Sequence, residues 1–423
     1  MDYSNKPSSW DGKKITSRNL PKLIFQAEVP EEYIQSVPAQ SLYMALRQNG
    51  MASSAELLET ATLEQCRLMI DLDCWYKDGL VEDNLWEWLG ACDAAQDLDL
   101  LHKIVHCIDL KLIAFLITRY VETHVFGEPT ESPPDDGFYT PDKGCTWVKI
   151  ETGDTHRNFL LARVLAAIFE KNADLFYQLL SISGVATPSQ LEEEAYQEKQ
   201  KRLAAEGIPE MEFAYKLNAP LSAAALLPDL KSKNPPPAVE AIPVVKPLVY
   251  DTYTLRPLED ILLRLEDAGD FESEFTLLMN AAMIRWGIEI YDLEQVAKMA
   301  LKVKGAINLG LEELMRLSGL SAFEVYSVMG LKKLYGCGLY RLINLGKCAR
   351  KLPSELLHTA GQESAAFAVV AGLREPFPEM PLFFMPNGTL KVEADGMLVK
   401  GYKAIEHLEE IESLSAFLAG LTA

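Results

Sequence analysis

The chain has 423 residues, of which 48% are hydrophobic and 24% are charged, and its formal net charge is −21. These proportions are typical of a folded chain with two or three cores and exclude an intrinsically disordered one. A chain this acidic repels a phosphate backbone, and no basic stripe of useful length offsets the charge, so we expect no nucleic-acid partner.

Residues 1 to 27 are polar and indicate a flexible lead-in without a secretory signal. The most hydrophobic stretch, LIAFLIT at residues 112 to 118, is far shorter than the about 20 residues that a membrane span needs, so we expect no membrane insertion. The seven cysteines are scattered through apolar patterns with no CxxC spacing. Reduced, buried thiols in a cytoplasmic protein would give this pattern.

Residues 28 to 126 have the pattern of a block of short helices. Thr62 and Gln65 have the spacing of a capping box at the start of one of them. A longer helix is predicted from about residue 99 to residue 121, with one apolar stripe along its length. Helices of this kind bury their apolar stripes by packing against each other.

Residues 127 to 216 predict a β-hairpin followed by long helices. The hairpin is expected over residues 138 to 150, because residues 141 to 144 suit a type I turn and an alternating pattern follows them. Farther along the chain, Thr187 can cap a helix and Pro188 can take its first position.

Residues 217 to 250 are rich in proline and predict an extended linker or a strap on the surface. Helical periodicity returns in residues 251 to 351 and predicts a second helical block. Residues 352 to 423 predict β-hairpins and a closing helix, with hairpin turns at Asn387-Gly388 and Asp395-Gly396. The expected fold class is mainly α: stacked short helices in superhelix-like blocks with small β-hairpin insertions.

The order of these segments, together with four local phrases, resembles a bacterial family of uncharacterised proteins known as a domain of unknown function. The phrases are LLETATLEQCRLMIDLDCWYKDGL, SQLEEEAYQEKQKRLAAEGIP, AINLGLEEL and LKKLYGCGLYRLINLGKCARKL. The resemblance covers the chain from about Leu20 to Leu421 and implies a shared domain plan, with no activity to carry over. More faintly, the N-terminal block is similar in pattern to the cytosolic N domain of MgtE-type magnesium transporters, a helical stack with a regulatory role.

The stretch DLDCWYKDGLVEDNLWEWL, residues 71 to 89, crowds acidic and aromatic residues together and raises the possibility of a calcium loop. Asp71, Asp73 and Glu82 fit ligand positions 1, 3 and 12 of an EF-hand loop. However, Tyr76 occupies the position where that loop requires glycine for its sharp turn. The sequence therefore favours a joint between two helices.

Three residues of the predicted 99–121 helix form a weak metal candidate. Asp99, His102 and His106 share one helix face, and histidines four residues apart can bind zinc. No further ligand is identifiable, and this face lies opposite the apolar stripe. A solvated helix face is the favoured interpretation.

The stretch Gly336-Cys337-Gly338 is an isolated GxG that follows a helical pattern and lacks the preceding strand of a phosphate-binding turn. Close helix packing or a kink is the favoured interpretation. No P-loop, GxSxG or nucleophile–base order stands out, so we assign no catalytic residue and expect no cofactor.

Trp86 and Trp88 point about 200° apart if their segment is helical. One of them is therefore expected to be exposed or to lie at a packing seam, where it could anchor a partner protein. The alternative is that both belong to a core between stacked helices.

The leading hypothesis from the sequence is a non-catalytic cytoplasmic interaction or scaffold protein. It would bind a protein partner through a helical surface, involving the region of Trp86 and Trp88 and the proline-rich strap. Two alternatives stay open: an enzyme whose site is assembled from residues distant in sequence, and a metal-sensing regulatory protein.

Overall fold

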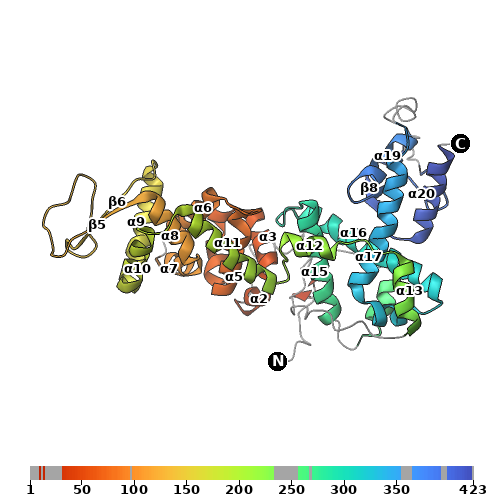
Figure 1. Cartoon of the computed structure of the whole chain (residues 1–423), viewed down its shortest axis with the longest axis horizontal. Helices are drawn as coiled ribbons and strands as arrows, with labels where there is room; N and C mark the ends of the chain where they lie inside the picture. The colour runs from red at the N-terminus through yellow and green to blue at the C-terminus, as the bar shows by residue number, and fades with distance from the viewer. Residues whose placement is uncertain are drawn as a thin grey trace. The chain divides into compact units, whose positions relative to one another are not determined.

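Helices form most of the chain that the structure describes, and its strands occur there as short antiparallel pairs. This computed structural model describes residues 9–10, 13–14, 31–95, 98–232, 256–265, 269–353, 364–391 and 398–421. It separates into two compact units, Met1–Leu203 and Ala204–Ala423 (Figure 1). The predicted mainly α fold with small β-hairpins is confirmed.

The first unit is a stack of short helices. They are α2 (Glu31–Ser36), α3 (Ala39–Asn49), the 3₁₀ helix η1 (Met51–Ser53), α4 (Ala55–Thr60), α5 (Leu63–Asp73), α6 (Glu82–Ala95), α7 (Leu98–Cys107), α8 (Leu110–Tyr120), α9 (Thr155–Lys171), α10 (Ala173–Ser183) and α11 (Pro188–Ala205). Alternate helices pack together: α3 on α5, α5 on α7, α7 on α9, and α8 on α10.

Three antiparallel strand pairs accompany these helices. They are β1 (Ser9–Trp10) with β2 (Lys13–Lys14), β3 (Trp75–Tyr76) with β4 (Gly79–Leu80), and β5 (Val121–Val125) with β6 (Thr146–Ile150). The pair β3–β4 joins α5 to α6, so the helix joint predicted for the acidic stretch is a tight hairpin.

Local signals set the ends of several helices as predicted. The Thr62 hydroxyl accepts a hydrogen bond from the backbone N–H of Gln65, and the Gln65 side chain accepts one from Thr62, which confirms the capping box at α5. At the start of α11, Gln190 N–H donates to the Thr187 hydroxyl at 3.3 Å and Pro188 takes the first helical position.

The single helix predicted from about residue 99 to residue 121 is wrong, because the chain breaks there into α7 and α8. Asp109 lies at the break, and its side chain accepts a hydrogen bond from the backbone N–H of Lys111 and so caps α8. The apolar stripe continues on both sides of the break, which is why periodicity alone predicted one helix.

The hairpin predicted at residues 138–150 is only partly correct. Along its whole length β6 pairs with β5, in a register that places Val121 opposite Ile150. The predicted segment contributes one antiparallel bridge, between Tyr139 and Val148, on the other edge of β6. The sequence missed β5 because its partner strand comes only after a long loop.

The second unit is built around its two longest helices. Its elements are α12 (Met211–Leu217), α13 (Ala223–Ser232), α14 (Arg256–Leu262), α15 (Gly269–Trp286), α16 (Leu293–Ser318), α17 (Ala322–Arg350), α19 (Ala365–Arg374) and α20 (Leu408–Gly420), with β7 (Glu379–Pro381) paired to β8 (Tyr402–Ala404). The long helices α16 and α17 pack along each other, and α13, α14, α15 and α20 pack against them.

Glycines allow α16 and α17 to approach closely. A Cβ on Gly310 would overlap the carbonyl oxygen of Leu334, and a Cβ on Gly338 would overlap that of Ala306. The close helix packing predicted for the GxG stretch at residues 336–338 is therefore confirmed. Only glycine leaves room for backbones at this separation.

A kink in α17 lies farther toward its N-terminus, at Gly330, where φ is +65°. The Glu274 carboxylate of α15 accepts hydrogen bonds from the backbone N–H groups of Leu331 at 3.0 Å and Lys332 at 2.9 Å. These are the donors that a helix start leaves unpaired, so Glu274 caps the second half of α17.

The extended strap predicted at residues 217–250 is wrong for residues 223–232, which form α13. Its sequence, AAALLPDLKS, is rich in strong helix formers, and their preference outweighs the single Pro228. Residues 233–250 lie outside the described chain, as does most of the predicted lead-in at residues 1–27.

The two hairpin turns predicted near the C-terminus differ in outcome. At Asn387-Gly388, glycine has φ +76° and Met385 N–H donates to the carbonyl of Thr389 at 3.0 Å, so the chain reverses as predicted. The Asp395-Gly396 turn lies outside the described residues.

Among the described helices, none is both long and apolar enough to cross a membrane.

The glycine contact between α16 and α17 gives a test of the packing. Gly338→Ala should lower the free energy of unfolding by about 1–3 kcal/mol or more, because the added methyl forces the two backbones apart. Chemical denaturation followed by circular dichroism measures this change. Gly420→Ala is the control, since a Cβ there meets no atom within 4 Å. Equal stabilities of the two variants would contradict the close approach.

Candidate functional site

The buried carboxylates of the acidic stretch at residues 71–89 make internal contacts. Arg202 donates to both carboxylate oxygens of Asp71, from Nε at 2.7 Å and from a terminal nitrogen at 2.9 Å. Burial raises the pKa of the Asp71 carboxyl, and the bound guanidinium of Arg202 opposes that shift. Tyr76, where calcium would require glycine, is part of β3. The helix joint favoured by the sequence is confirmed.

Asp73 is the most enclosed carboxylate of this stretch, with its side chain only 1% exposed. It accepts hydrogen bonds from the Tyr43 hydroxyl at 2.8 Å, from Arg47 Nε at 2.5 Å and from the Trp88 indole N–H at 2.9 Å. Trp88 is fully buried and belongs to the core between α3, α5 and α6.

Trp86 lies on a different face of α6, and it is also buried, with 4% of its surface exposed. Its indole N–H donates to Glu82 at 2.9 Å, and the Arg157 guanidinium lies 5.5 Å from its ring centroid. The expectation that Trp86 or Trp88 is exposed is therefore wrong, because α6 is covered on both faces. The other part of that expectation, a packing seam, fits Trp86, which contacts α9 through Arg157, and the alternative of two buried tryptophans between stacked helices agrees with the burial of both.

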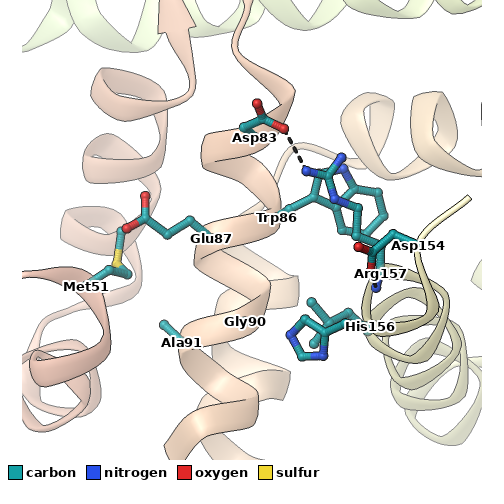
Figure 2. A pocket seen from close by; sticks show the side chains of 10 residues that line it. Met51, Asp83, Trp86, Glu87, Gly90, Ala91, Asp154, His156 and Arg157 are labelled. Atoms are coloured by element: carbon teal, nitrogen blue, oxygen red, sulfur yellow. Dashed lines mark hydrogen bonds and ion pairs between the residues drawn. The ribbon is translucent and has the colours of Figure 1, made fainter. Parts of the chain in front are cut away.

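A groove of about 420 Å³ opens beside Trp86 (Figure 2). Its residues come from η1, α6 and the N-terminal end of α9: Met51, Asp83, Trp86, Glu87, Gly90, Ala91, Asp154, His156, Arg157 and Leu160. Gly90 lies in the wall of the groove, where an added Cβ would make ordinary contact with a methyl of Leu160 at 3.9 Å and with His156 Nε2 at 4.0 Å, so any larger side chain would extend into the space between the helices.

Ion pairs arrange the charges around this groove. Asp83 accepts from Arg157 at 2.7 Å, and Glu87 pairs with Arg47 at 2.9 Å. Asp154 caps α9 by accepting from the backbone N–H of Arg157, and this hydrogen bond holds the pKa of Asp154 below its usual range. Asp154 is therefore a carboxylate near neutral pH.

The groove combines the groups that recognise a charged side chain. Arg157 offers a guanidinium and Asp83, Glu87 and Asp154 offer three carboxylates, while the largely buried Trp86 forms part of the wall behind them. The Asp83–Arg157 pair is exposed, with 80% of the Asp83 side chain open to solvent. Exposed pairs contribute only about 0–1 kcal/mol, so a ligand can exchange either member at little cost.

The weak metal candidates lie together on α7, away from this groove. Asp99 and His106 are exposed and His102 is half-buried. Within the described ranges, no three His, Cys, Asp or Glu side chains are grouped so that they could hold a metal ion. The geometry gives the Asp99, His102 and His106 set no support as a metal site.

Sequence reasoning missed the α9 half of the groove. Asp154, His156 and Arg157 follow Trp86 by about 70 residues, and no spacing rule connects them. The one local signal is that Asp154 precedes a helix and can cap it. Their position against α6 is a result of tertiary packing.

Sequence reasoning also missed Lys199 of α11. Its ammonium is buried and lies 5.4 Å from the ring centroid of Trp75 and 4.9 Å from that of Tyr196. Burial lowers the pKa of Lys199 to about 8, although the nearby charges of Asp71 and Asp78 act in the opposite direction.

Comparison with known proteins gives one match. A family model described as a family of unknown function (DUF6178) matches residues 14–421. No curated protein and no solved structure matches the chain. The similarity of the N-terminal block to the MgtE N domain therefore has no support from these comparisons.

The two tryptophans of α6 should differ in their effect on stability. Trp88→Phe leaves a buried oxygen of Asp73 without its donor and should lower the free energy of unfolding by about 2–4 kcal/mol. Trp86→Phe should lower it by less, about 1 kcal/mol, because Glu82 keeps its contacts with Tyr120 and Arg119. Urea denaturation measures both. A larger loss for Trp86→Phe would contradict the core role of Trp88.

Lys199 should make stability depend on pH in an alkaline window. As pH rises from 8 to 10.5, the native state loses this proton while the unfolded chain keeps it, so the free energy of unfolding rises. Lys199→Met should therefore be more stable than the wild type at pH 7, by on the order of 1–3 kcal/mol, and this advantage should shrink by pH 10. Denaturant titrations at several pH values measure it.

The control for this test is Lys201→Met, which removes an exposed ammonium from the same helix. Its stability relative to the wild type should not change over the same pH range. A Lys199→Met difference that stays constant from pH 7 to pH 10 would show that Lys199 titrates normally.

Proposed function

Because the chain belongs to the family of unknown function DUF6178, whose description names no activity, we propose its role from its geometry. We propose that it is a non-catalytic interaction protein that binds a partner protein through the groove between α6 and α9. The observation that carries this proposal is the open groove beside Trp86, where an aromatic ring, a guanidinium and carboxylates meet.

The composition of the groove supports binding of a protein surface. Trp, Tyr and Arg dominate the energetics of protein interfaces, and here Trp86 and Arg157 line the groove while Tyr120 packs on Trp86 outside it. The ring centroids of Trp86 and Tyr120 are 6.1 Å apart. Trp86 is held by its hydrogen bond to Glu82 and lies against Arg157, so the wall of the groove that carries the Arg157 guanidinium is preformed.

The charge of the chain favours a partner with basic side chains. The net charge is −21, and three of the groove residues are carboxylates. A partner lysine or arginine can pair with Asp83 in place of Arg157. This attraction would increase the rate of association and weaken at high salt.

We further propose that the protein acts in the cytoplasm. All seven of its cysteines are free, and five of them are buried. Thiols that never pair are typical of proteins in a reducing compartment.

Filling the groove should abolish partner binding. Gly90→Leu places a bulky side chain between α6 and α9 without disturbing the helix, since leucine is a stronger helix former than glycine. Affinity purification from the native host with quantitative mass spectrometry should recover proteins with the wild type that fall by about tenfold with Gly90→Leu.

Ala166→Leu is the matched control, because it adds the same side chain to an exposed position of α9 outside the groove. It should retain every protein that the wild type recovers. The proposal fails if Gly90→Leu recovers the same proteins as the wild type, or if no protein is recovered reproducibly at low salt.

A further inference from the structure

The strand β5 has one paired edge and one open edge. Phe126 N–H donates to the carbonyl of Cys145 at 2.8 Å, and Glu151 N–H donates to that of Tyr120 at 2.9 Å. In an antiparallel pair the residues alternate, so these bonds fix which residues of β5 face β6. Glu122 and His124 bond toward β6, like Tyr120 and Phe126, whereas the N–H and C=O groups of Val121, Thr123 and Val125 point to the other edge.

Few hydrogen bonds within the described chain reach this other edge. The N–H of Val121 donates to the carbonyl of Ile117 and closes the last turn of α8. Outside the β5–β6 ladder, no described hydrogen bond reaches the backbone of Thr123 or Val125. Val125 is 72% exposed. By contrast, the outer edge of β6 is partly used by Tyr139, so β5 carries the open side of this small sheet.

The sequence of β5, VETHV, is complementary to itself when it runs antiparallel. We propose that two copies of this chain pair through β5 across a two-fold axis at Thr123 and form a four-stranded antiparallel sheet. In this register Val121 lies opposite Val125, Glu122 lies opposite His124, and Thr123 lies opposite itself. The proposal stands independently of the groove between α6 and α9.

The hydrogen bonds of this register match the groups left open. Each Thr123 N–H donates to the Thr123 carbonyl of the other copy, and each Val125 N–H donates to the carbonyl of Val121. The new ladder between the two copies of β5 does not use the backbone groups that bond toward β6. The β5–β6 ladder and the β5–β5 ladder can therefore form at the same time. The two Thr123 residues lie directly opposite each other across the axis, and β-branched residues are favoured in such pairs.

The side-chain pairs also favour a second copy over an unrelated strand. Glu122 and His124 are exposed and 3.0 Å apart within one chain, so two copies bring two acid–imidazole pairs together on one face. β-branched residues directly across a sheet stabilise the pairing, and a carboxylate can accept a hydrogen bond from the imidazole opposite it. A contact centred on a two-fold axis also closes on itself, so it yields a dimer and no fibre.

The strand β5 lacks two of the usual protections of such an edge, a proline and a bulge. β5 contains no proline, and it pairs with β6 without a bulge over all five residues. A two-stranded ribbon alone is marginally stable in water, so two more strands strengthen it. Figure 1 shows β5, β6 and their connecting loop extending beyond α8, α9 and α10.

Charge exchange across the axis tests the register. Glu122→Lys removes the carboxylate opposite His124, and His124→Glu places an anion opposite Glu122, so each variant alone should dimerise about tenfold more weakly than the wild type. Mixed in equal amounts, the two variants pair Lys with Glu and His with Glu. The mixture should therefore recover the dimer. Sedimentation velocity of the full chain at low salt measures all four samples.

Two further variants complete the test. Thr123→Pro removes only an N–H that faces the open edge and should yield a monomer with an unchanged circular dichroism spectrum. Glu131→Lys makes the same charge change as Glu122→Lys in the following loop, where the residue is exposed, and should dimerise like the wild type.

Three outcomes would overturn the proposal. The first is a wild type that stays monomeric up to its solubility limit. The second is a dimer that survives Thr123→Pro, which would place the interface elsewhere. The third is a mixture of the two charge variants that remains monomeric, which would exclude the two-fold register and leave the edge to a strand of another protein.

Discussion

The arrangement of the first unit depends on one buried carboxylate. Asp73 has almost no contact with solvent, and a buried charge is stable only when hydrogen-bond donors surround it. Tyr43 and Arg47 from α3 and Trp88 from α6 supply those donors. The carboxylate thereby joins α3, α5 and α6 at one point and sets the rotation of α6 about its own axis.

That rotation determines where the groove forms. With Trp88 turned to Asp73, the helical repeat turns Trp86 toward α9, where Arg157 lies against its ring. Gly90, one turn farther along α6, then faces Leu160 and leaves space between the helices. The position of the groove is thus a consequence of how a core tryptophan satisfies a buried acid, because α6 could not rotate without disturbing that contact.

Predictions from the sequence succeeded where the determining contacts are local. Caps such as Thr62 with Gln65 act over three residues, and the glycine at 338 fits close helix packing whatever its partner is. Predictions failed where the determining contact is distant. Asp109 breaks a continuous apolar stripe, and β5 is a strand only because β6 pairs with it after a long loop. The burial of Trp86 likewise depends on Arg157 of α9, which no pattern within α6 predicts.

The structure pairs several acidic residues that the sequence alone suggests as a cation site. Asp71, Asp73 and Glu82 suggest a cation site by spacing, yet each is already neutralised by Arg202, Arg47 or Arg119. The carboxylates that remain open to a ligand are those in exposed pairs, as at Asp83. Two copies joined through β5 would carry two such grooves in one assembly, and a partner with two basic segments would then bind more tightly than either groove allows alone.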